Sequence, residues 1–479
     1  MKQRPVVVWF RNDLRLADNP ALTAAVKTGA PVIAVYIYDE NAAYAPGAAS
    51  CWWLHESLKA LQSAMAKLGM TLILRRGGEA KIVRAIVQET EAAAVFWNRR
   101  YSAPQVEIDK NLKNELSNGD VSVKTFNASL LREPWEIETG SGTPYRVFTP
   151  FWKKLKEFGP NRVSPLPAPK KLQSEKLIES EDLTSWNLQP DNPNWAKKIS
   201  AHWSPGEFTA INTLDNFLEN AIDAYGDGRD RPDKELTSRL SPHLHFGEIS
   251  PNQIWQSVQH GMNAGNFSEA AGYKFLSEIA WREFSYSLLY YNPSISEKPL
   301  RPEFAGYPWR DDPNGLGLWQ RGQTGYPIVD AGMRQLWRTG WMHNRVRMIV
   351  ASFLIKDLLI PWQHGAAWFW DTLVDADVAN NSASWQWVAG SGADASPYFR
   401  IFNPITQGEK FDPKGDYVRK FVPELKNLPD KFIHAPWKAP EAVLAKAGVT
   451  LGNNYNNPIV DHAHARNRAL AGYSEIKGR

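Results

Sequence analysis

The sequence predicts an α/β fold followed by an all-α fold. The first is a doubly wound, Rossmann-like parallel sheet over residues 1–133, and the second is a helical domain over residues 206–479. Three observations support this prediction. Short runs rich in β-branched and aromatic residues alternate with helical stretches as far as about Asn127. Helical periodicity dominates from about Gly206 onward. The chain of 479 residues also exceeds what one hydrophobic core usually organises.

The N-terminal elements alternate in type, as in a parallel sheet with crossover helices. No G-x-G-x-x-G sequence follows the first strand, and Gly77-Gly78 indicates only a turn, so a conventional dinucleotide site is not expected in this domain. Ligands of such a sheet normally bind beyond the carboxyl ends of the strands. We expect strands at Val6–Phe10, Val32–Tyr38, Thr71–Leu74, Ala94–Trp97 and Val121–Phe126, and helices at Pro20–Lys27, Ser50–Leu68 and Gln105–Leu116.

Residues 134–205 are expected to form a long interdomain linker, because the segment is rich in proline, lysine, serine and asparagine. Prolines that interrupt any helical pattern include Pro160, Pro165, Pro167, Pro169, Pro190 and Pro193. Strand patterns nearly vanish beyond the linker, so the second domain should be all-α. Its clearest helical patterns lie at Gly272–Tyr290, Tyr326–Thr339, Trp341–Asp357 and Ala366–Leu373.

Composition narrows the class of protein. No apolar run reaches about 18 residues, so no membrane association is expected. The single cysteine, Cys51, excludes an intramolecular disulfide and a cysteine-based zinc site, which fits a reducing compartment. We therefore expect a monomeric cytoplasmic protein without a metal site. The net charge of +4 is too small to indicate a polyanionic partner, whereas the 21 tryptophans are roughly three times the usual number.

One predicted helix carries a constellation suited to ligand binding. Glu278, Trp281 and Arg282 stand at i, i+3 and i+4, so a carboxyl, an indole and a guanidinium share one helix face. That face could hold a flat polar ligand. An amphipathic helix with an internal ion pair and a packed tryptophan explains the same pattern.

Other polar segments have two interpretations each. The hydroxyl-rich run Thr237–Ser241 before Pro242 suits a phosphate at a helix N-terminus, or an ordinary N-cap. Asp375 and Asp377 could belong to a site or to a cap. Trp341–Arg347 mixes indole, imidazole and guanidinium, which suits phosphate contact and base stacking, or a solvated basic helix. No H-E-x-x-H, C-x-x-C, G-x-S-x-G or Walker sequence is present.

Read in order, these segments and others resemble the photolyase/cryptochrome family, and most closely its bacterial cyclobutane pyrimidine dimer (CPD) photolyases. The resemblance runs from residue 5 to about residue 465. It implies an N-terminal antenna domain, a C-terminal helical FAD-binding domain and a flavoprotein lyase that repairs DNA under blue light. The motifs that carry it are Trp9–Arg15, Thr237–Ser241, Trp281–Phe284, Thr324–Asp330, Trp341–Arg345 and Phe399–Pro404.

The resemblance implies a U-shaped FAD within the helical domain. The residues that match phosphate-side contacts are Tyr225, Thr237, Ser238, Arg239, Leu240 and Ser241. Those that match contacts to the ribityl chain and ring are Glu278, Arg282, Asn344, Arg347, Asp375, Asp377 and Asn381. A reduced flavin anion is stabilised by a cation near its N1 atom and by an amide that hydrogen-bonds its N5 atom. Arg347 or Arg282 fits the first role, and Asn381 fits the second.

The resemblance also implies a flipped-out pyrimidine dimer as substrate. Trp281 and Trp387 would stack on the dimer, and Glu278 would hydrogen-bond a pyrimidine carbonyl while the excited, fully reduced flavin donates an electron. Further DNA contacts are implied for Asn344, Arg345, Met348 and Gln407. In this family a chain of tryptophans carries electrons from the surface to oxidised flavin, and the matching residues are Trp385, Trp362 and Trp309. Trp368 and Trp370 have two interpretations, as a second route or as packed aromatics.

An antenna chromophore is implied for the α/β domain. Trp97–Tyr101 and Cys51–Trp53 lie near where family members bind one, with Asn98 and Glu107 as candidate contacts. The familiar folate pattern is not matched cleanly; methenyltetrahydrofolate is favoured over a deazaflavin. A (6-4) photolyase would be expected to carry histidines where this chain has Asn344 and Met348. A cryptochrome photoreceptor would typically replace the amide of Asn381.

Overall fold

The computed structural model describes residues 3–171, 178–395 and 399–477. The chain divides into two compact units, each made of separate stretches of sequence. The first unit comprises Met1–Asp223, Ser238–Pro293 and Val374–Ala379, and the second comprises Ala224–Thr237, Ser294–Leu373 and Asn380–Arg479. The boundaries expected from the sequence at residues 133 and 205 stay predictions.

A five-stranded parallel sheet forms the N-terminal part of the first unit, as predicted. Its order is β3-β2-β1-β4-β5, so the chain winds outward from β1 in both directions and the strand order reverses between β1 and β4. The strands are β1 Val6–Phe10, β2 Val32–Tyr38, β3 Leu72–Arg76, β4 Ala94–Asn98 and β5 Ser122–Phe126. Every residue of β1 and β4 is buried, as expected for central strands covered on both faces.

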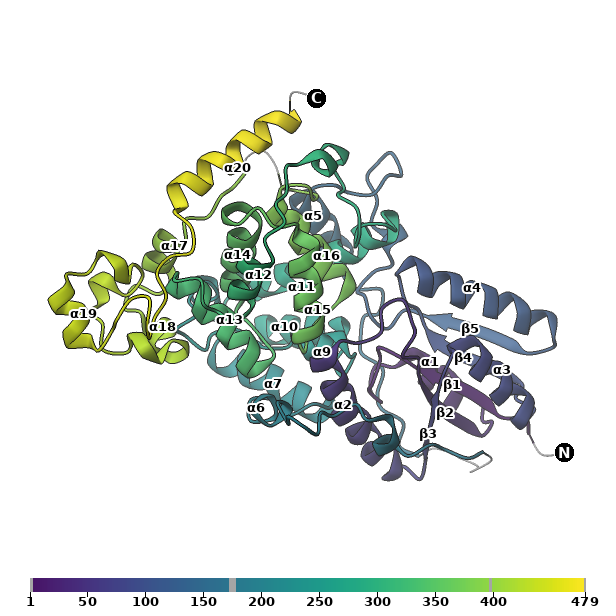
Figure 1. The fold of residues 1–479 in the computed structure, drawn as a ribbon. Coiled ribbons are helices and arrows are strands. Elements are labelled where there is room, and N and C mark those ends of the chain that lie inside the picture. The colour runs from purple at the N-terminus through teal and green to yellow at the C-terminus, as the bar shows by residue number, and fades with distance from the viewer. Residues whose placement is uncertain (1–2, 172–177, 396–398, 478–479) are drawn as a thin grey trace. The chain divides into compact units, whose positions relative to one another are not determined.

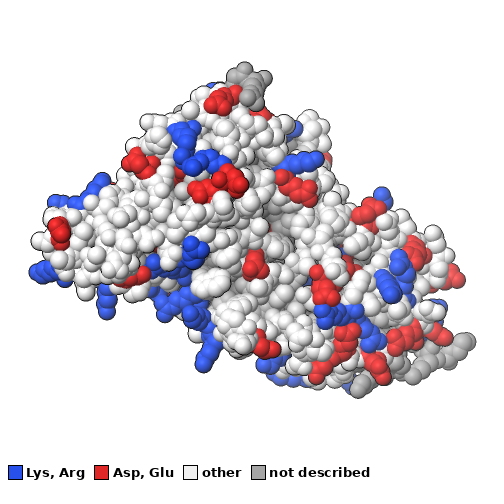
Figure 2. Space-filling view, viewed as in Figure 1, with Lys and Arg blue, Asp and Glu red and all other residues white. Residues whose placement is uncertain are grey.

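Helices cover the sheet (Figure 1). They are α1 Pro20–Val26, α2 Ala48–Ala66, α3 Glu79–Thr90 and α4 Ala103–Asn118. Alternate residues of the central strands, such as Trp9 and Trp97, form one core with Val83 of α3 and Leu112 of α4. On the face shown in Figure 2, basic and acidic side chains are interspersed over the region of α3 and α4. Arg84 of α3 and Glu115 of α4 form an ion pair at 2.6 Å.

Three local predictions were wrong. The sequence reading placed no helix between the third and fourth strands, whereas α3 begins directly after Gly78. It also treated residues 134–205 as an irregular linker, yet α5 Phe148–Phe158 and α6 Ala196–Ser200 lie there. Phe148, Phe151 and Leu155 give α5 a buried apolar stripe, and the prolines that were expected to break helices follow it. The helix expected from Trp341 begins later, at Asn344, because His343 caps it.

Helices make up the rest of the first unit: α7 Glu207–Asn220, α9 Ser241–His245, α10 Pro251–Asn263 and α11 Glu269–Tyr291. The second unit is helical, as predicted. It contains α8 Tyr225–Gly228, α12 Pro313–Gln320, α13 Pro327–Thr339, α14 Asn344–Ser352, α15 Trp362–Thr372, α17 Pro404–Phe411, α18 Asp416–Phe421, α19 Glu441–Ala447 and α20 His462–Lys477, while α16 Val378–Ala389 begins in the first unit and continues in the second.

Short helical turns complete the fold. The 3-10 turns lie at Pro134–Glu136, Leu183–Trp186, Pro302–Gly306, Pro423–Leu425, Asp430–Phe432 and Pro436–Lys438, and a π-helical turn at Phe353–Asp357 extends α14. Within the part of the chain that the structure describes, no helix is both long and apolar enough to cross a bilayer. The same residues contain no group of three His, Cys, Asp or Glu side chains placed to hold a metal ion.

Candidate active site

The site residues expected from the sequence are divided between the two units. The first unit holds Ser238, Arg239, Leu240, Ser241, Glu278, Trp281, Arg282, Asp375 and Asp377, and the second holds Tyr225, Thr237, Trp309, Asn344, Arg345, Arg347, Met348, Trp362, Asn381, Trp385, Trp387 and Gln407.

A buried polar cluster forms where the segment Val374–Ala379 joins the first unit. Asp377 accepts a hydrogen bond from the Tyr286 hydroxyl at 2.5 Å and lies 3.7 Å from Nδ1 of His245. Burial alone would raise the pKa of Asp377, but His245, Arg282 and the Tyr286 hydroxyl together hold it well below its ordinary value. Asp377 is therefore a buried carboxylate whose surroundings favour its charged form.

Arg282 is fixed beside this cluster. Its side chain is buried, one guanidinium nitrogen donates to the Ser129 carbonyl at 2.5 Å, and the guanidinium lies 4.7 Å from the centre of the Tyr286 ring. A planar cation held by a carbonyl and an aromatic face has little freedom to rotate. The sequence analysis did not identify Tyr286, His245 or Ser129. Tyr286 had a detectable signal, because it follows Arg282 by one helical turn.

The segment before α9 bends sharply. Arg239 has a positive φ of 54°, and its guanidinium lies 4.2 Å from the centre of the Trp203 ring. The Ser241 hydroxyl donates to Asp375 at 2.6 Å, which joins positions 134 residues apart in the sequence. Ser241 and Asp375, predicted separately, are therefore in contact. In this structure the Ser241 hydroxyl is already engaged as a donor, whereas Arg239 supplies positive charge.

Glu278 and Trp281 form the more accessible part of the α11 face. The Glu278 carboxylate lies 3.6 Å from Nζ of Lys274, one turn earlier, and its side chain is 22% exposed. Trp281 is partly buried and lies parallel to Phe148, with ring centres 3.7 Å apart and 8° between the planes. The face predicted from the i, i+3, i+4 spacing thus has a buried end at Arg282 and a half-buried carboxyl and indole.

In the second unit, α14 carries the basic residues predicted to touch DNA. Arg345 pairs with Asp230 at 2.8 Å and lies over the Phe411 ring, and Arg347 donates to the Met342 carbonyl at 2.7 Å. Burial lowers the pKa of His343 to about 4, so His343 is neutral near pH 7 and acts as the helix cap. Asn344 is exposed, and Met348 and Gln407 are half-buried.

The three tryptophans proposed as an electron route differ in exposure. Trp385 and Trp362 are 2% exposed and Trp309 is half-buried, as expected for a path from the interior to the surface. Gly365 lies directly beneath the Trp385 ring, since a Cβ there would come within 2.1 Å of the indole. Gly365 and Trp362 belong to the same helix, α15. Trp309 and Trp362 also line one cavity of about 370 Å³.

The remaining aromatic and amide residues have distinct surroundings. Trp368 stacks on Trp337 with ring centres 6.0 Å apart, and Trp337 is 57% exposed, so this pair is a surface stack. Trp387 lies beneath the guanidinium of Arg400. The Asn381 amide nitrogen donates to the Ala366 carbonyl at 3.1 Å, and among the described residues its amide oxygen accepts no hydrogen bond.

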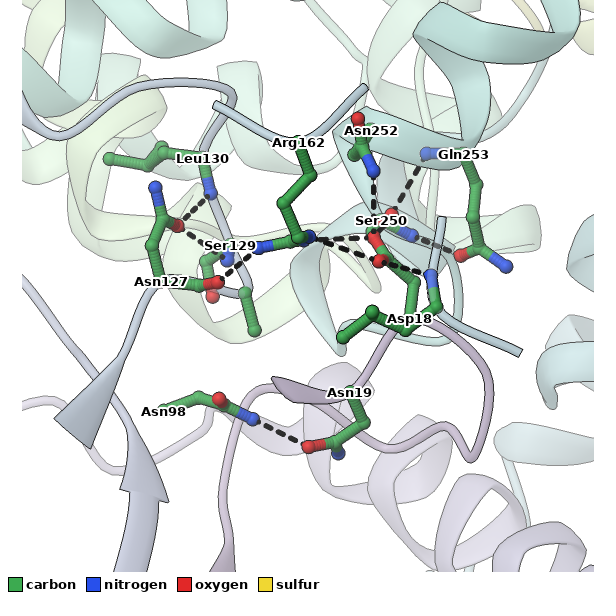
Figure 3. A network of polar contacts seen from close by, with 12 residues as sticks. Asp18, Asn19, Asn98, Asn127, Ser129, Leu130, Arg162, Ser250, Asn252 and Gln253 are labelled. Atoms are coloured by element: carbon green, nitrogen blue, oxygen red, sulfur yellow. Dashed lines mark hydrogen bonds and ion pairs between the residues drawn. The ribbon is translucent and has the colours of Figure 1, made fainter. Parts of the chain in front are cut away.

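The candidate antenna contacts in the α/β domain differ in burial and in their partners. Asn98, 4% exposed, donates to Asn19 at 2.8 Å (Figure 3) and also to Asp13. Arg100 pairs with Glu79 at 2.6 Å, and Trp53 is fully buried. Glu107 is exposed and accepts from Asn111 at 2.8 Å. The carboxyl ends of β1 and β4 are thus held by buried polar contacts, and Asn98 is buried among them whereas Glu107 is exposed.

The buried carboxyl of Glu283, next to Arg282, is expected to make the stability of the protein depend on pH. Burial raises the pKa of Glu283 to about 7, although Arg282 and the backbone N–H groups of Leu131 and Arg132 oppose this. A carboxyl whose pKa is raised in the folded state binds more protons when the protein is folded than when it is unfolded. Its stabilising contribution to the free energy of unfolding is therefore fully present below the unfolded pKa near 4.3 and is lost as pH rises through 7. The free energy of unfolding should fall by up to about 1.4 kcal/mol per pH unit in that window.

Urea unfolding of the wild type and of Glu283→Gln at pH 5, 6, 7 and 8 measures this effect. The variant should show a flatter pH profile, and Glu157→Gln, at an exposed position of α5, should follow the wild type. Parallel profiles for the wild type and Glu283→Gln would show that Glu283 is ionised throughout.

Comparisons with known proteins agree with this arrangement. A family model described as DNA photolyase matches residues 6–170, and one described as the FAD binding domain of DNA photolyase matches residues 275–475. The chain is similar to the deoxyribodipyrimidine photo-lyase of Agrobacterium fabrum, with 53% identity over 100% of this chain and 99% of that protein. It is 40% identical to Cryptochrome-1 of Arabidopsis thaliana, over 96% of this chain and 69% of that protein.

A solved structure shares the fold closely. The crystal structure of a bacterial class III photolyase from Agrobacterium tumefaciens covers 100% of this chain and 99% of its own, with a TM-score of 0.96 and 53% sequence identity. The parallel sheet and the helical part agree with the fold of that structure, and the two family models match most of the chain. This chain therefore belongs to the photolyase/cryptochrome family.

Proposed function

We propose that this protein is a deoxyribodipyrimidine photo-lyase, which uses light to split cyclobutane pyrimidine dimers in DNA with FAD as its cofactor. The observation that carries the proposal is the α11 face, where an accessible carboxyl and indole, Glu278 and Trp281, adjoin the buried Arg282. The relative from Agrobacterium fabrum, similar over the full length, bears the photo-lyase name.

The side chains fit FAD chemically. Of the first unit, we assign Ser238, Arg239, Leu240 and Ser241 to the phosphates, and Glu278, Arg282, Asp375 and Asp377 to the ribityl and ring side. Of the second unit, we assign Tyr225, Thr237, Asn344, Arg347 and Asn381. The amide of Asn381 supports the fit, because its nitrogen is bound by Ala366 and its oxygen can accept from an N–H group. FAD, when bound and reduced, supplies the electron that light excites.

The protein's own side chains bind and orient the substrate. An aromatic face offers about 1–3 kcal/mol of stacking per base, so Trp281 and Trp387 are assigned to the extruded dimer. Glu278 is assigned as the hydrogen-bonding partner of a pyrimidine carbonyl that becomes negatively charged during cleavage. Asn344, Arg345, Met348 and Gln407 are assigned to DNA contacts. Because Arg345 already pairs with Asp230, its phosphate contact would compete with that ion pair.

Further assignments rest on the family resemblance. We assign Trp385, Trp362 and Trp309 to electron transfer, in keeping with their graded exposure. We also propose a methenyltetrahydrofolate antenna, with a deazaflavin as the alternative. The polar contacts already made by Asn98 and the exposed position of Glu107 argue against these two residues as a joint antenna site. A monomer is proposed as the working form.

A repair assay tests the proposal. The holoprotein is reduced with dithiothreitol under blue light and mixed with an oligonucleotide that contains one thymine dimer, and recovery of thymine absorbance is followed with and without illumination. Light-dependent recovery is expected. Trp281→Ala should weaken lesion binding roughly tenfold to hundredfold, because stacking is lost. Glu278→Ala should lower the repair yield by a similar factor, because a hydrogen bond to a charged group is lost.

Glu269→Ala is the matched control, since Glu269 is exposed at the start of the same helix. Recovery in this variant should equal that of the wild type. No recovery despite a bound, photoreducible flavin would overturn the repair claim. The (6-4) lesion would then be tested first and a photoreceptor role second.

A further inference from the structure

Phe148 covers one face of the Trp281 indole. The two rings are nearly parallel, with an interplanar angle of 8° and centres 3.7 Å apart, which places the facing carbon atoms in van der Waals contact. Phe148 is 8% exposed, whereas Trp281 is only partly buried. The part of the indole that stays accessible therefore lies away from Phe148.

A third ring locks this pair. Phe284 lies edge-on to Phe148, with centres 6.0 Å apart, and edge-on to Trp281, with centres 5.9 Å apart. Phe151, one turn beyond Phe148 in α5, packs on Phe284 with centres 5.3 Å apart. The plane of the indole is thus set by rings from two helices, α5 and α11, and a change of its side-chain torsions would break these contacts.

We propose that Phe148 is a positioning residue that holds Trp281 as a flat stacking platform for the extruded pyrimidine dimer. This inference rests on the proposed function. A base that stacks on the accessible face would extend the pair into a stack of three rings, with Phe148 behind and the base in front. Because Phe148 fixes the indole before DNA arrives, binding does not have to order that side chain.

Phe148 acts only through Trp281, so its effect is specific to damaged DNA. Affinity for undamaged duplex depends on phosphate contacts, which the indole plane does not control. Replacement of the Phe148 ring by an aliphatic side chain of similar size should therefore weaken binding to damaged DNA and leave binding to undamaged DNA unchanged. Loss of the aromatic pair between Phe148 and Trp281 should lower the affinity for the lesion by about threefold to tenfold.

The first measurement examines the geometry without DNA. In holoprotein labelled with 5-fluorotryptophan, the ¹⁹F resonance of Trp281 is assigned from its absence in Trp281→Phe. Phe148→Leu and Phe148→Met remove the ring current above the indole, so this resonance should move or broaden. Phe148→Tyr keeps the ring and should leave it close to the wild-type position.

The second measurement compares binding to an oligonucleotide with one thymine dimer and to the same oligonucleotide undamaged. Phe148→Leu and Phe148→Met should lose lesion affinity alone, and Phe148→Tyr should restore it. Phe158→Leu is the matched control, because Phe158 is an aromatic residue of the same helix that is 41% exposed. It should match the wild type in both measurements.

The outcomes separate this inference from the proposed function. Unchanged lesion preference in both ring-less variants would overturn the positioning role while leaving repair intact. Tighter lesion binding in these variants would overturn it too, because it would mean that Phe148 occupies the face that the base needs. An equal loss for damaged and undamaged DNA would show a merely structural role. A wild-type protein without lesion preference would overturn the proposed substrate as well.

Discussion

Asp377→Asn is expected to cause loss of bound FAD and a large loss of stability. The wild-type carboxylate is buried, accepts from Tyr286, lies beside His245 and balances the nearby charge of Arg282. The amide that replaces it has nearly the same shape but no charge, so His245, 3.7 Å away, and the nearby Arg282 would both lose the buried carboxylate that attracts them. Breaking a buried ion pair from one side typically costs about 3–5 kcal/mol.

Two measurements distinguish the consequences for folding and for the cofactor. Urea unfolding gives the free energy of unfolding, which should fall by about 3–5 kcal/mol. The ratio of flavin to protein absorbance gives FAD content, which should fall because a carboxylate that we assign to the ribityl and ring side of FAD is replaced by a neutral amide. Tyr286→Phe removes one hydrogen bond but keeps the charge, so it should cost only about 1–2 kcal/mol and retain FAD.

Asp215→Asn controls for loss of an acidic residue, since Asp215 is exposed on α7 in the same unit. It should behave as the wild type. If Asp377→Asn kept both full FAD content and wild-type stability, the charge of Asp377 would have no role in the cluster, and the assignment of this cluster to the cofactor would fail.

The contrast between these residues shows what the sequence could reveal. The spacing of Glu278, Trp281 and Arg282 on one helix was sufficient to predict a shared face, because helical geometry is local. The partners that orient that face were not predictable, because Ser129, Phe148 and His245 come from other segments. Only packing brings these residues together.

The strands and helices also differ in whether the sequence alone was sufficient to predict them. The strand β1 and the first four residues of β4 are continuous apolar runs, so their sequence alone indicated a buried parallel sheet. The helix α3 was missed because its start at Gly78 had been interpreted only as a turn, although Ile82, Val83 and Ile86 have helical spacing. The helix α5 was missed because the prolines of its surroundings outweighed its apolar stripe. Because α5 was not predicted, Phe148 was not identified as a packing partner of Trp281.

Replacement of Asp18 is expected to produce the largest loss of stability in the α/β part. Asp18 is fully buried and has a positive φ of 47°. Its carboxylate accepts from the Ser250 hydroxyl at 2.6 Å and from Nη2 of Arg162 at 3.0 Å (Figure 3). It also accepts from the backbone N–H of Leu166 at 3.0 Å. It therefore ties the loop after β1 to the start of α10 and to the segment once expected to be an irregular linker.

Asp18→Asn should lower the free energy of unfolding by about 3–5 kcal/mol, because the charges of Arg15 and Arg162 lose their buried partner. Asparagine tolerates a positive φ, so backbone strain does not account for the effect. Asp120→Asn is a matched control, since Asp120 also has a positive φ, of 59°, but is exposed. It should lose no more than about 0.5 kcal/mol.

The pH dependence provides a further check on the same residue. Burial would raise the pKa of Asp18, but Arg15, Arg162 and the Ser250 hydroxyl hold it below its ordinary value. A carboxyl with a lowered pKa stabilises the fold above its unfolded pKa near 3.9, and this contribution is lost as pH falls through the folded value. The difference in unfolding free energy between the wild type and Asp18→Asn should therefore be constant from pH 6 to 8 and should shrink below pH 4. A difference that stayed constant into acid would mean that shape, and not charge, makes Asp18 necessary at this junction.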